Sequence, residues 1–175
     1  MTRESAISRA TRHFDEGQFI ADLARRVAIR TESQIPASRP FMDVYLNDEI
    51  TPAFARMGFK TEILPNPVEG VGPILLAERI EDDRLPTVLM YGHGDVIRGL
   101  EDQWRAGIEP WKLKQEGDRY YGRGTADDKA MAAIFVANLI RLKQENYVPD
   151  RDIIVALTAD EEGGGSNGVD WLIKN

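Results

Sequence analysis

The stretch that decides the fold class is IIVALTADEE, residues 153–162. Its first part, from Ile153 to Thr158, is nearly all apolar, which is typical of a strand buried on both faces of a parallel sheet. Its last three residues are acidic, so polar groups follow directly where this strand ends. Elsewhere in the chain, short apolar strands alternate with amphipathic helices, and this alternation predicts an α/β layered fold.

The other elements are predicted from the spacing of apolar residues along the chain. Residues 74–80 and 87–91 are two apolar runs separated by the charged turn 81–84, a pattern that predicts a hairpin. Residues 1–13 are expected to be a frayed lead-in, and residues 14–175 to form one domain. The remaining expected elements are short strands at 60–64 and 120–121 and helices that begin near Asp15, Pro40, Ala130 and Val169.

The composition narrows the class of protein. With 175 residues, the chain fits one domain that is able to bury a core. The net charge of −7 argues against a nucleic-acid partner, because phosphate binding requires clustered basic residues. The sequence has no apolar run of roughly 20 residues for a membrane span and no signal-peptide core, so a cytoplasmic protein is expected. The absence of cysteine excludes disulfides and thiolate zinc sites.

Three polar clusters stand where predicted strands or loops end. They are His93-Gly94-Asp95, then GRGTADDK at residues 122–129, and DEEGGG at residues 160–165. In open α/β sheets, ligand sites collect beyond the carboxyl ends of the strands. We therefore expect these clusters to converge, although they are far apart in the sequence.

The residue types in the clusters suit a metal-dependent hydrolase. A neutral imidazole with carboxylates is a ligand set that suits zinc. An aspartate two residues from a ligating histidine can accept the other ring N–H and fix the orientation of the ring. A single carboxylate can bridge two metal ions, and of two adjacent glutamates one can bind metal while the other accepts a proton from water.

Each cluster also has a purely structural interpretation. The pair His93 and Asp95 could form only a turn with a local hydrogen bond. Asp127 or Asp128 could be only a helix N-cap, which is a common role for aspartate. Residues 160–162 could be a solvated loop. The functional interpretation rests on all three clusters falling on the same kind of sheet edge.

Taken together, the three motifs are similar to those of the zinc aminoacylase and carboxypeptidase family of metallopeptidases. That family includes acetylornithine deacetylase, succinyl-diaminopimelate desuccinylase, glutamate carboxypeptidase and carnosinase-like dipeptidases. Its members carry His-x-Asp after a strand, then Gly-Arg-Gly-x-x-Asp-x-Lys-Gly, then a Glu-Glu pair after another strand. The resemblance extends from about Arg30 to Asn175. It implies the N-terminal portion of a three-layer α/β catalytic domain of the zinc-exopeptidase type.

The resemblance also implies a role for each matching residue. His93 would bind one zinc ion and Glu162 the other, with Asp127 bridging the two. Asp95 would orient His93, and Glu161 would be the general base and acid. The implied reaction is hydrolysis of an amide bond in a peptide or an N-acyl amino acid by a hydroxide bound to two zinc ions. Cobalt or manganese could replace zinc, and the full-length protein is expected to be a homodimer.

The chain departs from the family pattern in three respects. Ala130 stands where the family usually has glycine, and Arg98 follows the first motif, where it could attract a carboxylate substrate. In the family, each zinc ion takes one more ligand from beyond the position equivalent to Asn175, where a lid or dimerisation domain is also inserted. We therefore expect the chain alone to bind zinc weakly and to be inactive.

Two other classes of protein were weighed against the enzyme. The first is a truncated, non-catalytic α/β module that acts through partner contact across an apolar face. The second is a dinucleotide-binding domain. The second is disfavoured, because Gly122-Arg123-Gly124 lacks the third glycine at the spacing that this motif requires.

Overall fold

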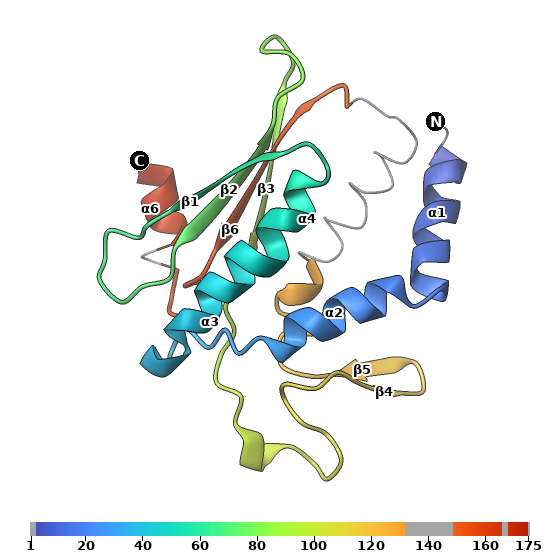
Figure 1. Cartoon of the computed structure of the whole chain (residues 1–175), viewed down its shortest axis with the longest axis vertical. Coiled ribbons are helices and arrows are strands. Elements are labelled where there is room, and N and C mark those ends of the chain that lie inside the picture. Colours follow the sequence, from blue (N-terminus) through green and yellow to red (C-terminus); the bar gives the residue numbers. More distant parts are fainter. Residues whose placement is uncertain (1–2, 132–148, 166–167, 175) are drawn as a thin grey trace.

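A computed structural model describes residues 3–131, 149–165 and 168–174 (Figure 1). The strands of the described residues are β1 Lys60–Leu64, β2 Ile74–Arg79, β3 Thr87–His93, β4 Lys114–Glu116, β5 Arg119–Tyr121 and β6 Asp152–Thr158. The α-helices are α1 Arg3–Asp15, α2 Gln18–Ala28, α3 Arg39–Val44, α4 Thr51–Ala55 and α6 Val169–Lys174. Two short 3₁₀ turns, Pro36–Ser38 and Glu101–Gln103, and a π-helical turn, Tyr45–Ile50, complete the set.

The central feature is a four-stranded mixed sheet in the order β1-β2-β6-β3. Strand β6 pairs antiparallel with β2 and parallel with β3, so it lies inside the sheet and most of its residues are buried. The buried apolar strand that the sequence predicts at 153–158 is thus confirmed. Strands β4 and β5 form a separate two-stranded sheet. The α/β class is also confirmed.

The hairpin predicted for residues 74–80 and 87–91 is wrong. Strands β2 and β3 do not pair with each other, because β6 lies between them. The charged turn that joins them wraps around the start of β6 instead: Asp152 Oδ1 accepts the backbone N–H of Glu81 at 2.8 Å. A turn signal is local, so it does not reveal that a strand seventy residues later in the chain separates the two runs.

Residues 3–13, which the sequence analysis assigns to a frayed lead-in, lie in the helix α1. Its acidic residue Glu4 in the first turn and its basic residue Arg12 in the last turn complement the helix dipole. Gly17, with a φ of 75°, turns the chain from α1 into α2 (Figure 1). His13 is 6% exposed and its Nδ1 lies 2.7 Å from Gln18 Oε1, which ties the two helices together.

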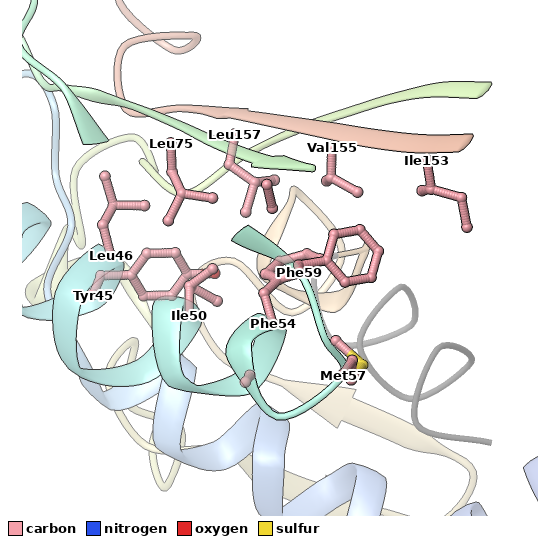
Figure 2. Close-up of a cluster of buried hydrophobic side chains, with 12 residues drawn as sticks. Tyr45, Leu46, Ile50, Phe54, Met57, Phe59, Leu75, Ile153, Val155 and Leu157 are labelled. Carbon is pink, nitrogen blue, oxygen red and sulfur yellow. The ribbon is translucent and has the colours of Figure 1, made fainter. Parts of the chain in front are cut away.

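The hydrophobic core lies between the sheet and the long helical segment of residues 39–55 (Figure 2). This segment confirms the helix predicted from Pro40. The π-helical turn precedes Pro52, which has no backbone N–H to continue the α-helical hydrogen bonds. Residues from the segment, from the turn that follows it and from the strands pack in one cluster: Tyr45, Leu46, Ile50, Ala53, Phe54, Met57, Phe59, Leu75, Ala77, Ile153, Val155 and Leu157.

Two further observations complete the comparison with the sequence. The helix predicted from Val169 is confirmed as α6, whereas the helix predicted over 130–143 lies outside the described residues after Met131. No helix in the described part of the chain is both long and apolar enough to cross a membrane.

Among the described residues, strand β3 forms one edge of the sheet, and it exposes Val88 and Leu89.

Two leucines of the sheet provide a matched test of this core. Leu157 is fully buried and Leu89 is 69% exposed. We expect Leu157→Ala to lower the free energy of unfolding by about 2–5 kcal/mol. Leu89→Ala should change it by less than about 0.5 kcal/mol. Urea denaturation of both variants measures the difference. Equal losses would contradict the core described above.

Candidate metal centre

The parallel pairing of β3 and β6 brings two of the polar clusters together. In the register of this pair, His93 lies opposite Thr158, and the N–H of Gly94 donates to the Thr158 carbonyl at 2.8 Å. Both strands therefore end at the same edge of the sheet. The loop that carries Glu161 and Glu162 follows β6 directly, so the convergence expected for these clusters is observed.

His93 is the centre of the site. It is 5% exposed, and its Nε2 lies 2.9 Å from Asp127 Oδ1 and 3.8 Å from Glu161 Oε2. Its Nδ1 lies 3.1 Å from the carbonyl oxygen of Asp95 and 3.4 Å from Asp95 Oδ1. The Nδ1 edge of the ring thus lies against Asp95, while Nε2 points toward carboxylates of the other two clusters.

Asp95 has contacts beyond the single one that the sequence indicates. Its side chain is fully buried. Oδ1 accepts the backbone N–H of Glu161 at 3.1 Å, and Oδ2 accepts the backbone N–H of Glu162 at 3.0 Å. One carboxylate therefore fixes the Glu-Glu loop and lies against the imidazole. The hydrogen bond from the Glu162 N–H to Asp95 is what fixes Glu162 beside His93.

Asp127 and Asp128 contact His93 in different ways. The buried Asp128 accepts the backbone N–H of His93 through Oδ2 at 3.1 Å. The side chain of Asp127 is 74% exposed and reaches the imidazole from the solvent side. The peptide bond between the two aspartates is cis. Both aspartates therefore contact the histidine directly, one at its backbone and one at its ring. The helix that either could cap lies outside the described residues after Met131.

The charges of the site are strongly coupled. Burial alone would lower the pKa of His93, but the hydrogen bond and charge of Asp95, the charge of Asp128 and the hydrogen bond of Asp127 raise it to about 9. Burial raises the pKa of Asp128. Burial and the nearby Asp127 charge raise the pKa of Glu162. Carboxylates are thus crowded around one imidazole, an arrangement that a bound cation would stabilise.

The donor atoms fit zinc in kind. An imidazole nitrogen and carboxylate oxygens are ordinary zinc ligands, and Nε2 of His93 directly faces Oδ1 of Asp127. Within residues 3–131, 149–165 and 168–174, however, no group of three or more His, Asp or Glu side chains is arranged to hold a metal ion. The described residues therefore match a metal centre in chemistry, but supply fewer ligands than the three usual for catalytic zinc.

Several residues that support the site carry no clear signal in the sequence. Thr31 Oγ1 donates to the Gly94 carbonyl at 2.6 Å, and the N–H of Val96 donates to the Thr31 carbonyl at 2.8 Å. Nothing in the sequence around Thr31 signals this role. Lys129 is fully buried, and burial lowers its pKa to about 7 against the opposing charges of Asp95 and Glu32. A lysine at the start of an apolar helix was the signal that could have revealed it.

A cavity of about 210 Å³ lies beside the Glu-Glu loop. It is lined on one side by Ala159 and Asp160, which directly precede the two glutamates. The other walls come from the segment 32–36, which includes Ser33, from the start of α3 at Arg39, and from the loop 69–72. The cavity therefore opens next to the segment that carries the candidate acid and base.

Comparison with known proteins identifies the family. A model of the peptidase family M20/M25/M40 matches residues 89–175, which include all three polar clusters. The chain belongs to this family. The resemblance inferred from the motifs is confirmed.

The curated relatives are longer than this chain. A probable succinyl-diaminopimelate desuccinylase from Staphylococcus aureus strain MRSA252 is 38% identical over 78 residues, which are 44% of this chain and 19% of the relative. Succinyl-diaminopimelate desuccinylase from Parvibaculum lavamentivorans is 34% identical over 122 residues, 69% of this chain and 30% of the relative. The chain thus spans less than a third of the length of either relative.

Solved structures confirm the fold. Human carnosine dipeptidase 1 superimposes with a TM-score of 0.83 at 24% sequence identity, covering 93% of this chain and 35% of the dipeptidase. The M20 family metallo-carboxypeptidase Sso-CP2 from Sulfolobus solfataricus gives a TM-score of 0.74 at 22% identity, covering 90% and 34%. The described sheet and helices therefore share the fold of about a third of each of these two solved chains.

The contacts of Asp95 predict the titration of His93 in the metal-free chain. The Asp95 carboxylate stabilises the imidazolium, so Asp95→Asn should move the His93 pKa from about 9 toward its ordinary value of 6.5. NMR titration of the imidazole signals measures this, and His13, the only other histidine, is an internal reference. An Asp118→Asn variant, in the exposed turn between β4 and β5, is the matched control. An unchanged His93 pKa in the Asp95 variant would refute the assignment.

Proposed function

We propose that the whole protein carrying this chain is a metal-dependent hydrolase that cleaves an amide bond in a peptide or an N-acyl amino acid. In this proposal, residues 14–175 are the N-terminal part of its catalytic domain. The observation that carries the proposal is the contact of His93 Nε2 with Asp127 Oδ1, with Glu161 Oε2 within 3.8 Å. Family membership supports it, since the three residues come from the three motifs that the family model covers.

The metal ligands in this proposal are His93, Asp127 and Glu162. His93 and Glu162 would each hold one of two zinc ions, and Asp127 would contact both through its two oxygens; cobalt or manganese could take the same donors. Zinc bound there would polarise the carbonyl of the scissile amide and lower the pKa of a water molecule. Burial and, to a lesser extent, the charges of neighbouring carboxylates raise the pKa values of Asp128 and Glu162, and a bound cation would relieve this destabilisation of their charged forms.

Asp95 prepares the site for this ligand set. By contacting Nδ1 of His93 through its carbonyl and carboxylate, it leaves Nε2 to face Asp127. By accepting the backbone N–H groups of Glu161 and Glu162, it holds the two glutamates at the same edge of the sheet. An orienting partner of this kind raises the affinity of a histidine for metal.

Glu161 is the proposed general base and acid. Its side chain is 43% exposed, so it can reach both water and substrate, while its backbone is fixed by Asp95. The carboxylate would take a proton from the attacking water and deliver it to the leaving amine. The substrate would lie over Glu161, and the adjacent cavity of about 210 Å³ offers room for one of its side chains.

The substrate class follows from the relatives and stays broad. One curated relative is named for removal of a succinyl group and one solved structure for cleavage of a dipeptide. In both cases the name implies hydrolysis next to an acyl carbon, which agrees with one carboxylate serving as base and then acid. The homodimer, the cytoplasmic location and the absence of nucleic-acid and membrane partners stay predictions.

A second candidate function is a non-catalytic module that acts through partner contact. It is favoured by one observation: the described residues contain no group of three donors that could hold a metal ion. The same observation leads us to propose that the 175-residue chain alone is inactive. Metal binding separates the two candidates, because the module requires no metal.

Zinc titration of the metal-free chain by calorimetry is the first test. We expect measurable but weak binding, reduced at least about tenfold by Asp127→Ala and unaffected by the matched surface variant Asp118→Ala. The affinity should rise about tenfold for each pH unit between 7 and 9, because zinc must displace the proton of His93 below its pKa of about 9. Equal binding by the Asp127 and Asp118 variants would exclude the proposed centre.

Turnover of the complete gene product tests the role of Glu161. The Glu161→Gln variant keeps the size of the side chain but removes the base, so kcat should fall by about 10²–10⁴-fold. Zinc content, measured by atomic absorption, should not change, since Glu161 is not a proposed ligand. Dipeptides and N-succinyl amino acids are the two substrate panels. A variant with normal turnover would remove Glu161 from the mechanism.

A further inference from the structure

Lys129 is an unusual residue for the interior of this fold. It is 0% exposed, and its Nζ donates to the carbonyl of Arg26 at 2.9 Å and to the carbonyl of Ile29 at 2.5 Å. Burial of an ammonium group is unfavourable unless hydrogen bonds and charges compensate for lost hydration. Lys129 lies two residues after Asp127 and directly after Asp128.

The partners of Lys129 lie at the carboxyl end of α2. Ile29 is the residue that caps this helix. Its backbone N–H already donates to the Arg26 carbonyl, and its own carbonyl accepts the N–H of Thr31. Because a carbonyl oxygen has two lone pairs, Lys129 adds a second hydrogen bond to each. The negative end of the helix dipole also favours a cation there. Lys129 therefore anchors the segment with Asp127 and Asp128 to a rigid helix that is about a hundred residues away in the sequence.

Tyr45 connects the same lysine to the histidine motif. Lys129 Nζ lies 5.5 Å from the centroid of the Tyr45 ring, in a cation–π contact. The ring packs directly beneath Gly94, where a Cβ atom would lie only 2.6 Å from Tyr45 Cε1. One stack of groups therefore runs from α2 through Lys129 and Tyr45 to the turn between His93 and Asp95.

The glycine of the second motif packs against the lysine as well. Gly124 has a φ of 83°, and a Cβ atom there would lie 3.0 Å from Lys129 Cδ. The stem of Lys129 thus fills the space under the 122–128 loop, while its ammonium group is held on α2. The nearby carboxylates whose charges act on it are Asp95 and Glu32.

We infer that Lys129 is a positioning residue for the candidate metal centre: its ammonium group, anchored on the end of α2, holds Asp127 and Asp128 against His93. Only the expected benefit of this role to metal binding rests on the proposed function. The geometric role concerns the metal-free chain, in which Asp127 and Asp128 already contact the imidazole ring and backbone of His93. Loss of the ammonium group should therefore disturb His93 before any metal is added.

The test uses long-range ¹H–¹⁵N NMR spectra of the two imidazoles in the metal-free chain at pH 6, where His93 is protonated. Lys129→Met keeps the length of the side chain without the charge, and Lys60→Met on strand β1 is the matched control. We expect Lys129→Met to shift the His93 signals, to leave those of His13 in place and to weaken zinc binding at least about tenfold. Unmoved His93 signals in a folded Lys129→Met chain would overturn the inference.

A chemical rescue separates the charge from packing. The chain has no cysteine, so Lys129→Cys introduces one unique thiol that can be alkylated in the unfolded state. Bromoethylamine restores an ammonium group on a side chain of nearly the original length, whereas propyl iodide gives the same length without charge. We expect only the charged product to restore the His93 signals and the zinc affinity. Equal restoration by both products would show that Lys129 serves packing alone.

Two outcomes of these experiments require a further comparison. If circular dichroism shows that the uncharged variants are unfolded, Lys129→Arg, which keeps a cation, is compared with the original chain, and we expect it to keep the His93 signals close to their original positions. A folded arginine variant with displaced His93 signals would overturn the inference, because a cation at this position would then not be sufficient. If the original chain binds no zinc, turnover of the complete gene product still tests the proposed function, and the imidazole spectra alone decide the role of Lys129.

Discussion

The parallel pairing of β3 with β6 is the constraint on which the rest of this structure depends. Two strands that run in the same direction end at the same edge, so the residues that follow them are placed side by side without contact between their loops being required. The register that sets His93 opposite Thr158 therefore determines how far the imidazole lies from the Glu-Glu loop. A shift of the register by one residue would turn the histidine to the other face of the sheet.

At the sheet edge that this pairing creates, Asp95 and Lys129 have complementary contacts. Asp95 is a buried acceptor that joins the imidazole to the backbone of Glu161 and Glu162. Lys129 is a buried donor that joins α2 to the segment of Asp127 and Asp128. The charge of Asp95 favours the ammonium form of Lys129, although burial outweighs it and lowers the pKa of the lysine to about 7. The exposed carboxylates of the site are in this way supported by groups that solvent does not reach.

The sequence predicted some levels of this structure better than others. The apolar run at 153–158 and the polar residues after it predicted the buried strand and the convergence with His93, because periodicity and sheet topology are general rules. The hairpin was predicted wrongly, since the intervention of β6 between β2 and β3 is a tertiary event that no local turn signal encodes. The α1 helix was missed because its apolar content is low. The contacts of Thr31 and Tyr45 with Gly94 were missed, because neither a long-range hydrogen bond nor close packing has a signature in sequence spacing.

The exposed edge of the sheet has a consequence for any preparation of this chain. Strand β3 pairs on one side only among the described residues, and Val88, Leu89 and Tyr91 are 43%, 69% and 39% exposed along it. An unpaired, apolar edge is a template onto which a foreign strand can add. Concentrated samples are therefore expected to associate through this edge. A charged side chain on the exposed face of β3 should oppose that association.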